Sequence, residues 1–304
     1  MSVAAKLVEV IEAGDCLGEG PVWNPADQRL WWTDIHNRRL RRWGPGDTAI
    51  TDVATPERLC SFALVDSGPG RLLAAFETGL AWFEPASGAV DWIARPEAGG
   101  PEASGTGRRF NDGRTDRSGR FWVGTMVEDE ARAGAASASL WRFDNVAGLV
   151  ACEAGISISN SLASSPDGRT LYFADTPGRA IHAYDLDPAT GAIGRKRLFA
   201  EVERGYPDGA TVDAEGCLWS ARWGGGEVVR HAPDGRVLEV VGTPAAQPTC
   251  VAFGGPDLSL MFVTSATESL TAEARAAQPL AGAVFVYETG AVGLAEVPFR
   301  TATS

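Results

Sequence analysis

The stretch GYPDGATVDAEGCLW, residues 205–219, contains the pattern that predicts the fold. A Pro-Asp-Gly corner precedes a short apolar segment, which is followed by a second turn and another apolar segment. Pro, Asp and Gly favour tight turns, and short apolar runs between such turns are typical of β-strands. The stretch therefore predicts two successive strands, with Asp208 immediately before the first.

The same arrangement recurs along the chain. A turn-like cluster precedes each strand-like run, such as FWVGTM or LYFADT, and the runs begin 42 to 50 residues apart. The residues that begin them are Leu30, Leu72, Phe121, Leu171, Leu218 and Met261. Repeats of this length, built from short strands, are typical of a β-propeller. We therefore predict an all-β, six-bladed β-propeller that forms a single domain over residues 1–304.

Two further features concern the ends and loops of this propeller. Residues 5–13 (AKLVEVIEA) alternate in polarity, and we expect them to add an outer strand to the last blade, with residues 293–299 as the alternative. Two insertions, residues 128–139 and 269–277, are expected to form loops over one mouth of the channel. Long loops on a rigid scaffold are where specificity usually resides.

Charge and composition exclude several classes of partner. A net charge of −12 and a pI near 4.8 oppose binding to nucleic acid, which requires a basic surface. No apolar run is as long as a membrane span, and the N-terminal segment lacks the apolar run of a signal peptide. We expect a cytoplasmic protein with neither a nucleic-acid partner nor a membrane partner.

Several types of catalytic site are also absent from the sequence. The five cysteines are widely spaced and form no CxxC pair, so neither a disulfide framework nor a zinc knuckle is indicated. There is no HExxH and no GxSxG motif, and the chain has two lysines, Lys6 and Lys196. Zincin, nucleophile-elbow and Schiff-base chemistry therefore lack their usual residues.

The repeat does place oxygen ligands in phase. In a propeller the innermost strand of each blade lines the channel, and one repeat position is occupied by Glu19, Ser61, Asn111, Asn160, Asp208 and Cys250. Aligning the repeats on the Asp-Gly pair instead makes Asp112 the partner of Asp208. Although Asn and Asp also favour turns, carboxylate and amide oxygens around one axis predict a site for a divalent cation.

Five segments carry a resemblance to a known family. They are LGEGPVW (17–23), RFNDGRTDRSGRFWVGTM (109–126), SNSLASSPDGRTLYFADT (159–176), YPDGATVDAEGCLWSARWGGG (206–226) and TCVAFGG (249–255). With these motifs the chain resembles the senescence marker protein, gluconolactonase and regucalcin (LRE-like) family over nearly its whole length. The resemblance implies a six-bladed propeller that hydrolyses sugar lactones with one divalent metal in the channel. It also implies Glu19, Asn160 and Asp208 as the metal ligands.

The resemblance extends to the residues that hold the substrate. Arg109 and Asn111 match the residues that bind the lactone, and an acidic contact follows the GTM motif, where this chain offers Glu128 and Asp129. Of these two we prefer Asp129. We expect Asp208 to orient or deprotonate the attacking water while also contacting the metal.

The resulting functional prediction is metal-dependent hydrolysis of a sugar aldonolactone, such as a gluconolactone, xylonolactone or arabinolactone, to the aldonic acid. Ca²⁺ and Zn²⁺ are the favoured cations, and Mn²⁺, Mg²⁺ and Fe²⁺ accept the same ligand set. The alternatives are another metal-dependent hydrolase of esters or phosphotriesters on the same site, and a non-catalytic calcium-binding propeller. The sequence leaves open which sugar, which metal and which oligomeric state apply.

Overall fold

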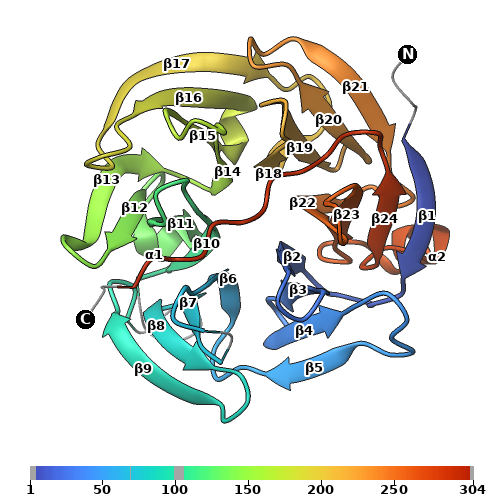
Figure 1. Cartoon of the computed structure of the whole chain (residues 1–304), viewed down its shortest axis with the longest axis horizontal. Coiled ribbons are helices and arrows are strands. Elements are labelled where there is room, and N and C mark those ends of the chain that lie inside the picture. Colours follow the sequence, from blue (N-terminus) through green and yellow to red (C-terminus); the bar gives the residue numbers. More distant parts are fainter. Residues whose placement is uncertain (1–4, 69, 99–105, 302–304) are drawn as a thin grey trace.

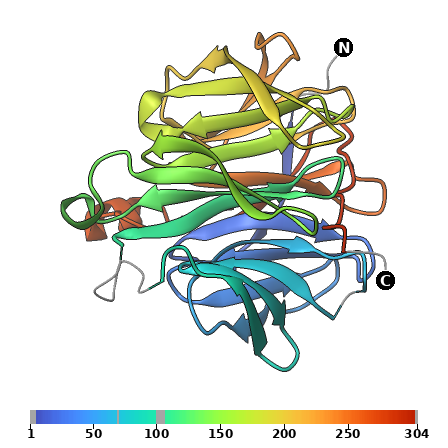
Figure 2. The ribbon, with the colours of Figure 1, turned by 90° about the vertical axis from the view of Figure 1, so that its left-hand side faces the viewer.

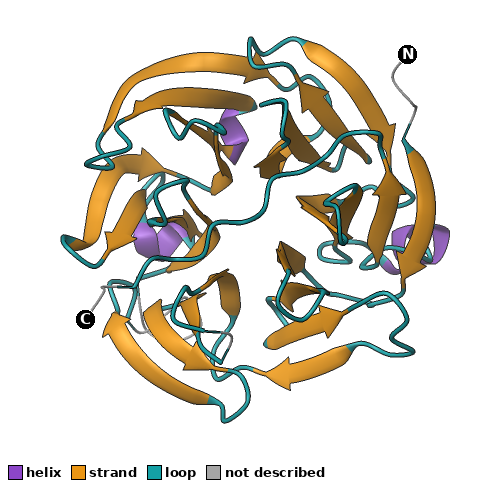
Figure 3. Ribbon diagram, in the orientation of Figure 1, coloured by secondary structure: helices purple, strands orange, loops and turns teal. Residues whose placement is uncertain are grey.

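The computed structural model describes residues 5–68, 70–98 and 106–301. Within this part of the chain, the strands form six four-stranded sheets that surround a central channel as blades (Figures 1 and 3). Neighbouring strands of a blade pair in the antiparallel direction. The predicted all-β, six-bladed propeller is confirmed.

Each blade contains four strands, ordered from the innermost to the outermost. The first three are β2 (Gly18–Asn24), β3 (Arg29–Asp34), β4 (Arg39–Trp43), β5 (Thr51–Ala54); β6 (Leu59–Leu64), β7 (Leu72–Phe76), β8 (Gly79–Glu84), β9 (Ala89–Ala94); and β10 (Arg108–Thr115), β11 (Phe121–Val127), β12 (Ala138–Asp144), β13 (Gly148–Ile156). The others are β14 (Ser159–Ser164), β15 (Thr170–Asp175), β16 (Ala180–Leu186), β17 (Ile193–Glu201); β18 (Tyr206–Val212), β19 (Leu218–Trp223), β20 (Glu227–His231), β21 (Val237–Gly242); and β22 (Pro248–Gly254), β23 (Leu260–Ser265), β24 (Val284–Glu288), β1 (Lys6–Ile11).

Three short helices are present in the described part of the chain. They are α1 (Glu130–Ala133), the 3₁₀ turn η1 (Thr176–Gly178) and α2 (Ala272–Ala277). None of the described helices is long and apolar enough to cross a membrane. The helices α1 and α2 lie within the two insertions that the sequence placed over one mouth of the channel, and both project from the same face of the ring (Figure 2).

An aspartate fixes the turn between the first and second strands in two of the blades. Asp116 accepts hydrogen bonds from two backbone N–H groups of its turn (2.8 and 3.0 Å) and from the indole nitrogen of Trp122 (3.0 Å). Asp213 likewise accepts hydrogen bonds from two backbone N–H groups of its turn and from the indole nitrogen of Trp219 (2.9 Å). Because a buried indole needs an acceptor, this contact ties the second strand to the turn before it. In all six blades the second strand begins within one residue of the predicted position.

The ring is closed by its two ends. The N-terminal strand β1 pairs with β24 from Lys6 opposite Glu288 to Ile11 opposite Val284, and it is the outermost strand of the last blade. The expected closure by the N-terminal residues is therefore confirmed. The alternative, an outer strand formed by residues 293–299, is wrong because this segment crosses the end of the channel instead (Figure 1).

We call residues 291–301 the C-terminal strap. Its backbone forms hydrogen bonds with Leu64, Gly119 and Ala214, which lie at or after the ends of the inner strands β6, β10 and β18. An ion pair between Glu296 and the buried Arg114 fastens its middle over the channel. The strap lies on the face opposite to α1 and α2 (Figure 2). It therefore covers the mouth where the inner strands end.

Phe299 anchors the strap, and its truncation should destabilise the fold. Its ring is fully buried, stacks on Phe143 at 5.3 Å and meets Trp82 edge-on at 5.7 Å. Removing a buried phenylalanine side chain typically costs about 3–5 kcal/mol. We expect Phe299→Ala to lower the free energy of unfolding by about this amount, measured in urea. Val292→Ala, at a half-exposed strap position, should change it by less than about 0.5 kcal/mol; equal stability of both variants would contradict the anchoring role.

Candidate functional site

The innermost strand of every blade contains an irregularity where the predicted site residues lie. The pairing register shifts between Glu19 and Val22 in β2, and between Asn160 and Ala163 in β14. The same shift occurs in β6, β10, β18 and β22. A β-bulge interrupts the alternation of side chains and redirects them, often beside active sites. The bulges therefore allow polar side chains near the start of each inner strand to face the channel.

One cavity of about 220 Å³ collects these side chains. Of the residues that the sequence predicted for the site, the cavity is lined by Glu19, Arg109, Asn111, Asn160 and Asp208. Leu17, Met126, Ile158 and Trp223 provide apolar walls, while Thr176, Glu268 and Ser269 add polar groups. Because Glu19, Asn160 and Asp208 lie near the starts of their inner strands, the cavity lies at the mouth of the channel opposite to the C-terminal strap.

The amide of Asn160 has a fixed orientation. Its nitrogen donates to the hydroxyl oxygen of Thr176 (2.8 Å), and that hydroxyl donates to the carbonyl of Pro207 (3.0 Å). The hydroxyl proton is thus already used, so the amide nitrogen and not the oxygen must face Thr176. The oxygen of Asn160 faces Asn111, whose amide nitrogen lies 3.2 Å away. The sequence analysis missed Thr176, although it ends the quoted motif SNSLASSPDGRTLYFADT.

Three buried carboxylates lie close enough to influence one another. Burial, followed by the charge of Asp112, raises the pKa of Glu19 to about 8. Burial, followed by the charges of Glu19 and Asp112, raises the pKa of Asp208 well above its usual range. Burial also raises the pKa of Asp112. Without a compensating positive charge, these groups are driven toward their neutral forms.

This donor set fits a divalent cation. Two carboxylates and one oriented amide oxygen are ligands of the kind that hard cations prefer, and a cation's two charges would offset Glu19 and Asp208. The described part of the chain provides no cationic side chain that forms an ion pair with either carboxylate. The raised pKa values therefore mark the place where a cation would be bound most favourably.

Arg109 connects the cation site to a buried ion network. Its Nη1 donates to the amide oxygen of Asn111 at 2.7 Å, and its Nε donates to Glu128 at 2.5 Å. Glu128 also accepts hydrogen bonds from both terminal nitrogens of Arg58, at 2.9 Å each. Burial alone would raise the pKa of Glu128, but the two arginines outweigh it and lower the pKa to about 2. Arg109 is therefore held rigidly, with Nη2 left for a ligand because no described residue accepts from it.

Glu128 and Asp129 occupy different environments. Asp129 is the N-cap of α1, where its side chain accepts from the backbone N–H of Arg132 at 3.2 Å, and it also forms an ion pair with that arginine. Neither Glu128 nor Asp129 lines the cavity. Because Glu128 forms ion pairs with both Arg58 and Arg109, the geometry favours it over the preferred Asp129 as the acidic group next to Arg109.

The Asp-Gly pairs of the inner strands β10 and β18 have a steric origin. A Cβ on Gly209 would lie 2.2 Å from the Sγ of Cys250, and one on Gly113 would lie 2.6 Å from the Oγ of Ser61. Each glycine therefore lets its inner strand pass closely beside the next one. Ser61 and Cys250, the two uncharged residues at the predicted repeat position, lie on the inner strands β6 and β22.

The two ways of aligning the repeats selected neighbouring residues within one bulge of β10. Asn111 lines the cavity, whereas the next residue, Asp112, does not and accepts a hydrogen bond from the backbone N–H of Leu162 at 2.8 Å. The charge of Asp112 nevertheless acts on the pKa values of Glu19 and Asp208.

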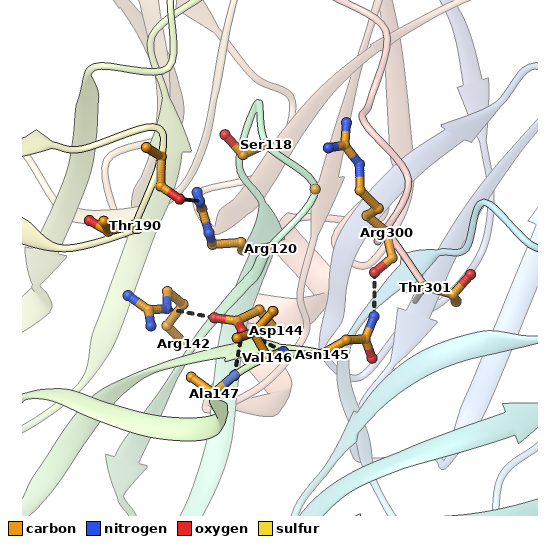
Figure 4. A pocket seen from close by; sticks show the side chains of 12 residues that line it. Ser118, Arg120, Arg142, Asp144, Asn145, Val146, Ala147, Thr190, Arg300 and Thr301 are labelled. Carbon is orange, nitrogen blue, oxygen red and sulfur yellow. Dashed lines mark hydrogen bonds and ion pairs between the residues drawn. The ribbon is translucent and has the colours of Figure 1, made fainter. Parts of the chain in front are cut away.

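A larger cavity of about 540 Å³ lies elsewhere, beside the strap (Figure 4). Two of its three arginines are already engaged: Arg120 donates to the carbonyls of Pro188 and Ala189 (2.7 Å each), and Arg142 donates to Asp144 at 3.1 Å. None of the predicted site residues lines it. Size alone therefore does not identify the functional site, and the channel cavity is the candidate because of its donors.

A second acidic group is present in the fifth blade. Donor atoms of Asp213, Glu215 and Cys217 lie within 4.8 Å of one another. However, Arg230 contacts both carboxylates, at 2.7 and 2.6 Å, and Asp213 also holds Trp219. An arginine already supplies the positive charge here, so this group stabilises a turn.

The chain is similar to known proteins over most of its length. The profile of the SMP-30/Gluconolactonase/LRE-like region matches residues 17–267. The chain is 37% identical to 6-deoxy-6-sulfogluconolactonase of Pseudomonas putida (95% of this chain, 97% of the relative) and 38% identical to L-arabinolactonase of Azospirillum brasilense (97% and 96%). A crystal structure described as a calcium-binding protein, regucalcin, from Agrobacterium tumefaciens superposes with a TM-score of 0.88 at 33% identity, covering 97% of this chain and 98% of that one.

Proposed function

Because this chain belongs to the SMP-30/Gluconolactonase/LRE-like family, we propose that it is a sugar lactonase that hydrolyses an aldonolactone at the channel site. The observation that carries the proposal is the convergence of Glu19, Asn160 and Asp208 beside Arg109 in one cavity. The similar proteins named as acting on sulfogluconolactone and arabinolactone cover nearly the whole chain. An aldonolactone of five or six carbons is therefore the proposed substrate class.

Glu19, Asn160 and Asp208 would hold one divalent cation, with Ca²⁺ or Zn²⁺ proposed. Such a cation polarises a carbonyl group and makes a neighbouring water more acidic. Burial, followed by the charges of Glu19 and Asp112, raises the pKa of Asp208, so a bound cation would favour its ionised form. The charge state that catalysis requires thus depends on the cation.

The side chains then divide the reaction between them. Asp208 takes a proton from the attacking water as the water oxygen bonds to the lactone carbonyl carbon. The ring carbon–oxygen bond breaks next, and the departing ring oxygen receives that proton and becomes a hydroxyl group. Nη2 of Arg109 is free to donate to the substrate, and Glu128 and Asn111 hold the guanidinium in place. Fixed donors next to developing negative charge are an effective source of rate enhancement.

A substrate panel tests the proposed activity. We expect the purified protein to hydrolyse five- and six-carbon aldonolactones, detected by proton release, with a kcat/KM at least about tenfold above that for aryl esters and phosphotriesters. The reason is that Arg109 and the polar cavity wall match a hydroxylated ring. Faster hydrolysis of aryl esters or phosphotriesters would assign a different ester class to the site. Absence of any hydrolysis with Ca²⁺, Zn²⁺, Mn²⁺ and Mg²⁺ supplied would overturn the enzymatic role.

A further inference from the structure

A further carboxylate stands at the rim of the same cavity. Glu268 follows β23, just before the insertion that contains α2, and it lines the cavity together with Glu19 and Asp208. Its side chain is 34% exposed, whereas Glu19 and Asp208 are buried residues. It therefore lies nearer to solvent than the cation ligands. No step of the proposed hydrolysis uses it.

The position of Glu268 is fixed by several independent contacts. Its backbone N–H donates to the carbonyl of Cys16 at 3.0 Å, and its own carbonyl accepts from the side chain of Gln247 at 3.0 Å. One carboxylate oxygen, Oε1, contacts Nε2 of His36 at 3.0 Å. The next residue, Ser269, has a φ of 59°, in the left-handed region that non-glycine residues rarely adopt. The carboxylate is thus held ready for a ligand at little further entropic cost.

The second carboxylate oxygen of Glu268, Oε2, has no hydrogen-bond partner among the described residues. A carboxylate oxygen can only accept, so the ligand group that suits it is a donor such as a sugar hydroxyl. A lactone whose carbonyl lies beside Asp208 and Arg109 would present its remote end to the rim. The group at that end is the hydroxyl on the carbon farthest from the carbonyl.

The charge around the cavity opposes an anion at the same place. Arg109 is the cationic side chain that lines the described cavity, and Glu128 matches its charge at 2.5 Å. The two charges of a bound cation would be matched by Glu19 and Asp208. His36 is already engaged by Glu268. A sulfonate, phosphate or carboxylate at the remote end would therefore face Glu268 without an unpaired cationic side chain among the residues that line the cavity.

We propose that Glu268 is a specificity-determining residue that accepts a hydrogen bond from the remote hydroxyl of a neutral aldonolactone and excludes lactones that carry an anionic group there. This inference rests on the proposed lactonase function. A single carboxylate at the rim can select the substrate, because its oxygen both accepts a hydrogen bond from the hydroxyl of a neutral lactone and repels an anionic group.

The test compares a neutral six-carbon aldonolactone with its analogue bearing a 6-sulfonate. We expect wild-type protein to prefer the neutral lactone in kcat/KM by at least about tenfold. Glu268→Gln should shrink this preference by about tenfold, mainly because KM for the sulfonated lactone falls. Glu268→Asp keeps the charge but withdraws the oxygen by one methylene, so it should raise KM for the neutral lactone and still exclude the sulfonated one.

Glu273→Gln is the matched control because it removes the same charge from an exposed position on α2, outside the cavity. It should leave the preference unchanged, and melting temperatures should show that all variants are folded. An equal preference in wild type and Glu268→Gln, with the neutral lactone still hydrolysed, would overturn the role of Glu268 alone. A wild-type preference for the sulfonated lactone would also overturn it. Failure of the wild type to hydrolyse either lactone would overturn the proposed function and this inference together.

Discussion

Asp208→Asn should lower the turnover number for lactone hydrolysis by roughly 10²- to 10⁴-fold, even at saturating cation. The substitution keeps the size of the side chain and one oxygen ligand, but it removes the negative charge and the basic lone pair. If Asp208 only bound the cation, raising the cation concentration would restore much of the rate. If it also accepts the proton from water, as we propose, the loss persists. The measurement is a cation titration of lactone hydrolysis by the folded variant.

Two other variants separate the proposed roles. Asn160→Ala should act mainly on cation affinity, because it removes one neutral oxygen and leaves both carboxylates. Arg109→Ala should act mainly on KM, because its free Nη2 is proposed to contact the substrate, although it also leaves Glu128 with Arg58 as its remaining ion-pair partner. A folded Asp208→Asn protein with near-normal turnover at saturating cation would leave Glu19, Asp112 or the cation alone to activate the water.

Removal of the cation should abolish hydrolysis reversibly and should make stability depend on pH in a defined direction. In the cation-free protein the pKa of Glu19 is raised to about 8, so the folded state favours the protonated acid. Such a group stabilises the fold below its unfolded pKa, near 4.3, and this contribution disappears as the pH rises toward 8. Cation-free protein should therefore lose stability between about pH 5 and pH 8.

The expected loss of stability follows from the raised pKa of Glu19. A tenfold change in a protonation equilibrium corresponds to about 1.4 kcal/mol, so raising this pKa from about 4.3 to about 8 is expected to cost on the order of 5 kcal/mol at pH 8. This amounts to roughly 8 °C in melting temperature for a domain of this size. Saturating cation should remove most of the loss, and Asp208→Asn should show a smaller pH dependence because one charge is gone. A melting temperature that rises from pH 5 to pH 8 without cation would contradict this sign.

The repeat made the architecture predictable from the sequence. Turn clusters recur at a nearly constant spacing, and the contact between Asp116 and Trp122 shows why the second strand must begin where it does. The closing strand β1 was also predictable from the alternating polarity of its sequence, although its first four residues are all exposed in the structure. The C-terminal strap was not, because it follows no strand period and its path is set by contacts with the ends of three inner strands.

The site was predictable where side chains belong to the repeat and not where they belong to loops. Glu19, Asn160 and Asp208 occupy equivalent repeat positions on inner strands, so the repeat predicted that they lie together. The bulge in β10 shifts the register, so the repeat did not distinguish Asn111 from Asp112. Thr176 and Glu268 follow the second strands, where no repeat position marks a channel-facing side chain. Local sequence did not separate Glu128 from its neighbour, because the ion network with Arg58 is formed only in the fold.

The most direct test of the cation-dependent lactonase site is the rate of hydrolysis of the best aldonolactone by wild-type protein after exhaustive chelation, followed by stepwise return of Ca²⁺ or Zn²⁺. We expect no activity above background in the chelated protein. We also expect a saturable return of the full rate with one cation bound per chain, which the Asp208→Asn variant fails to reach. Full activity in a demonstrably cation-free sample would contradict the proposed role of the cation.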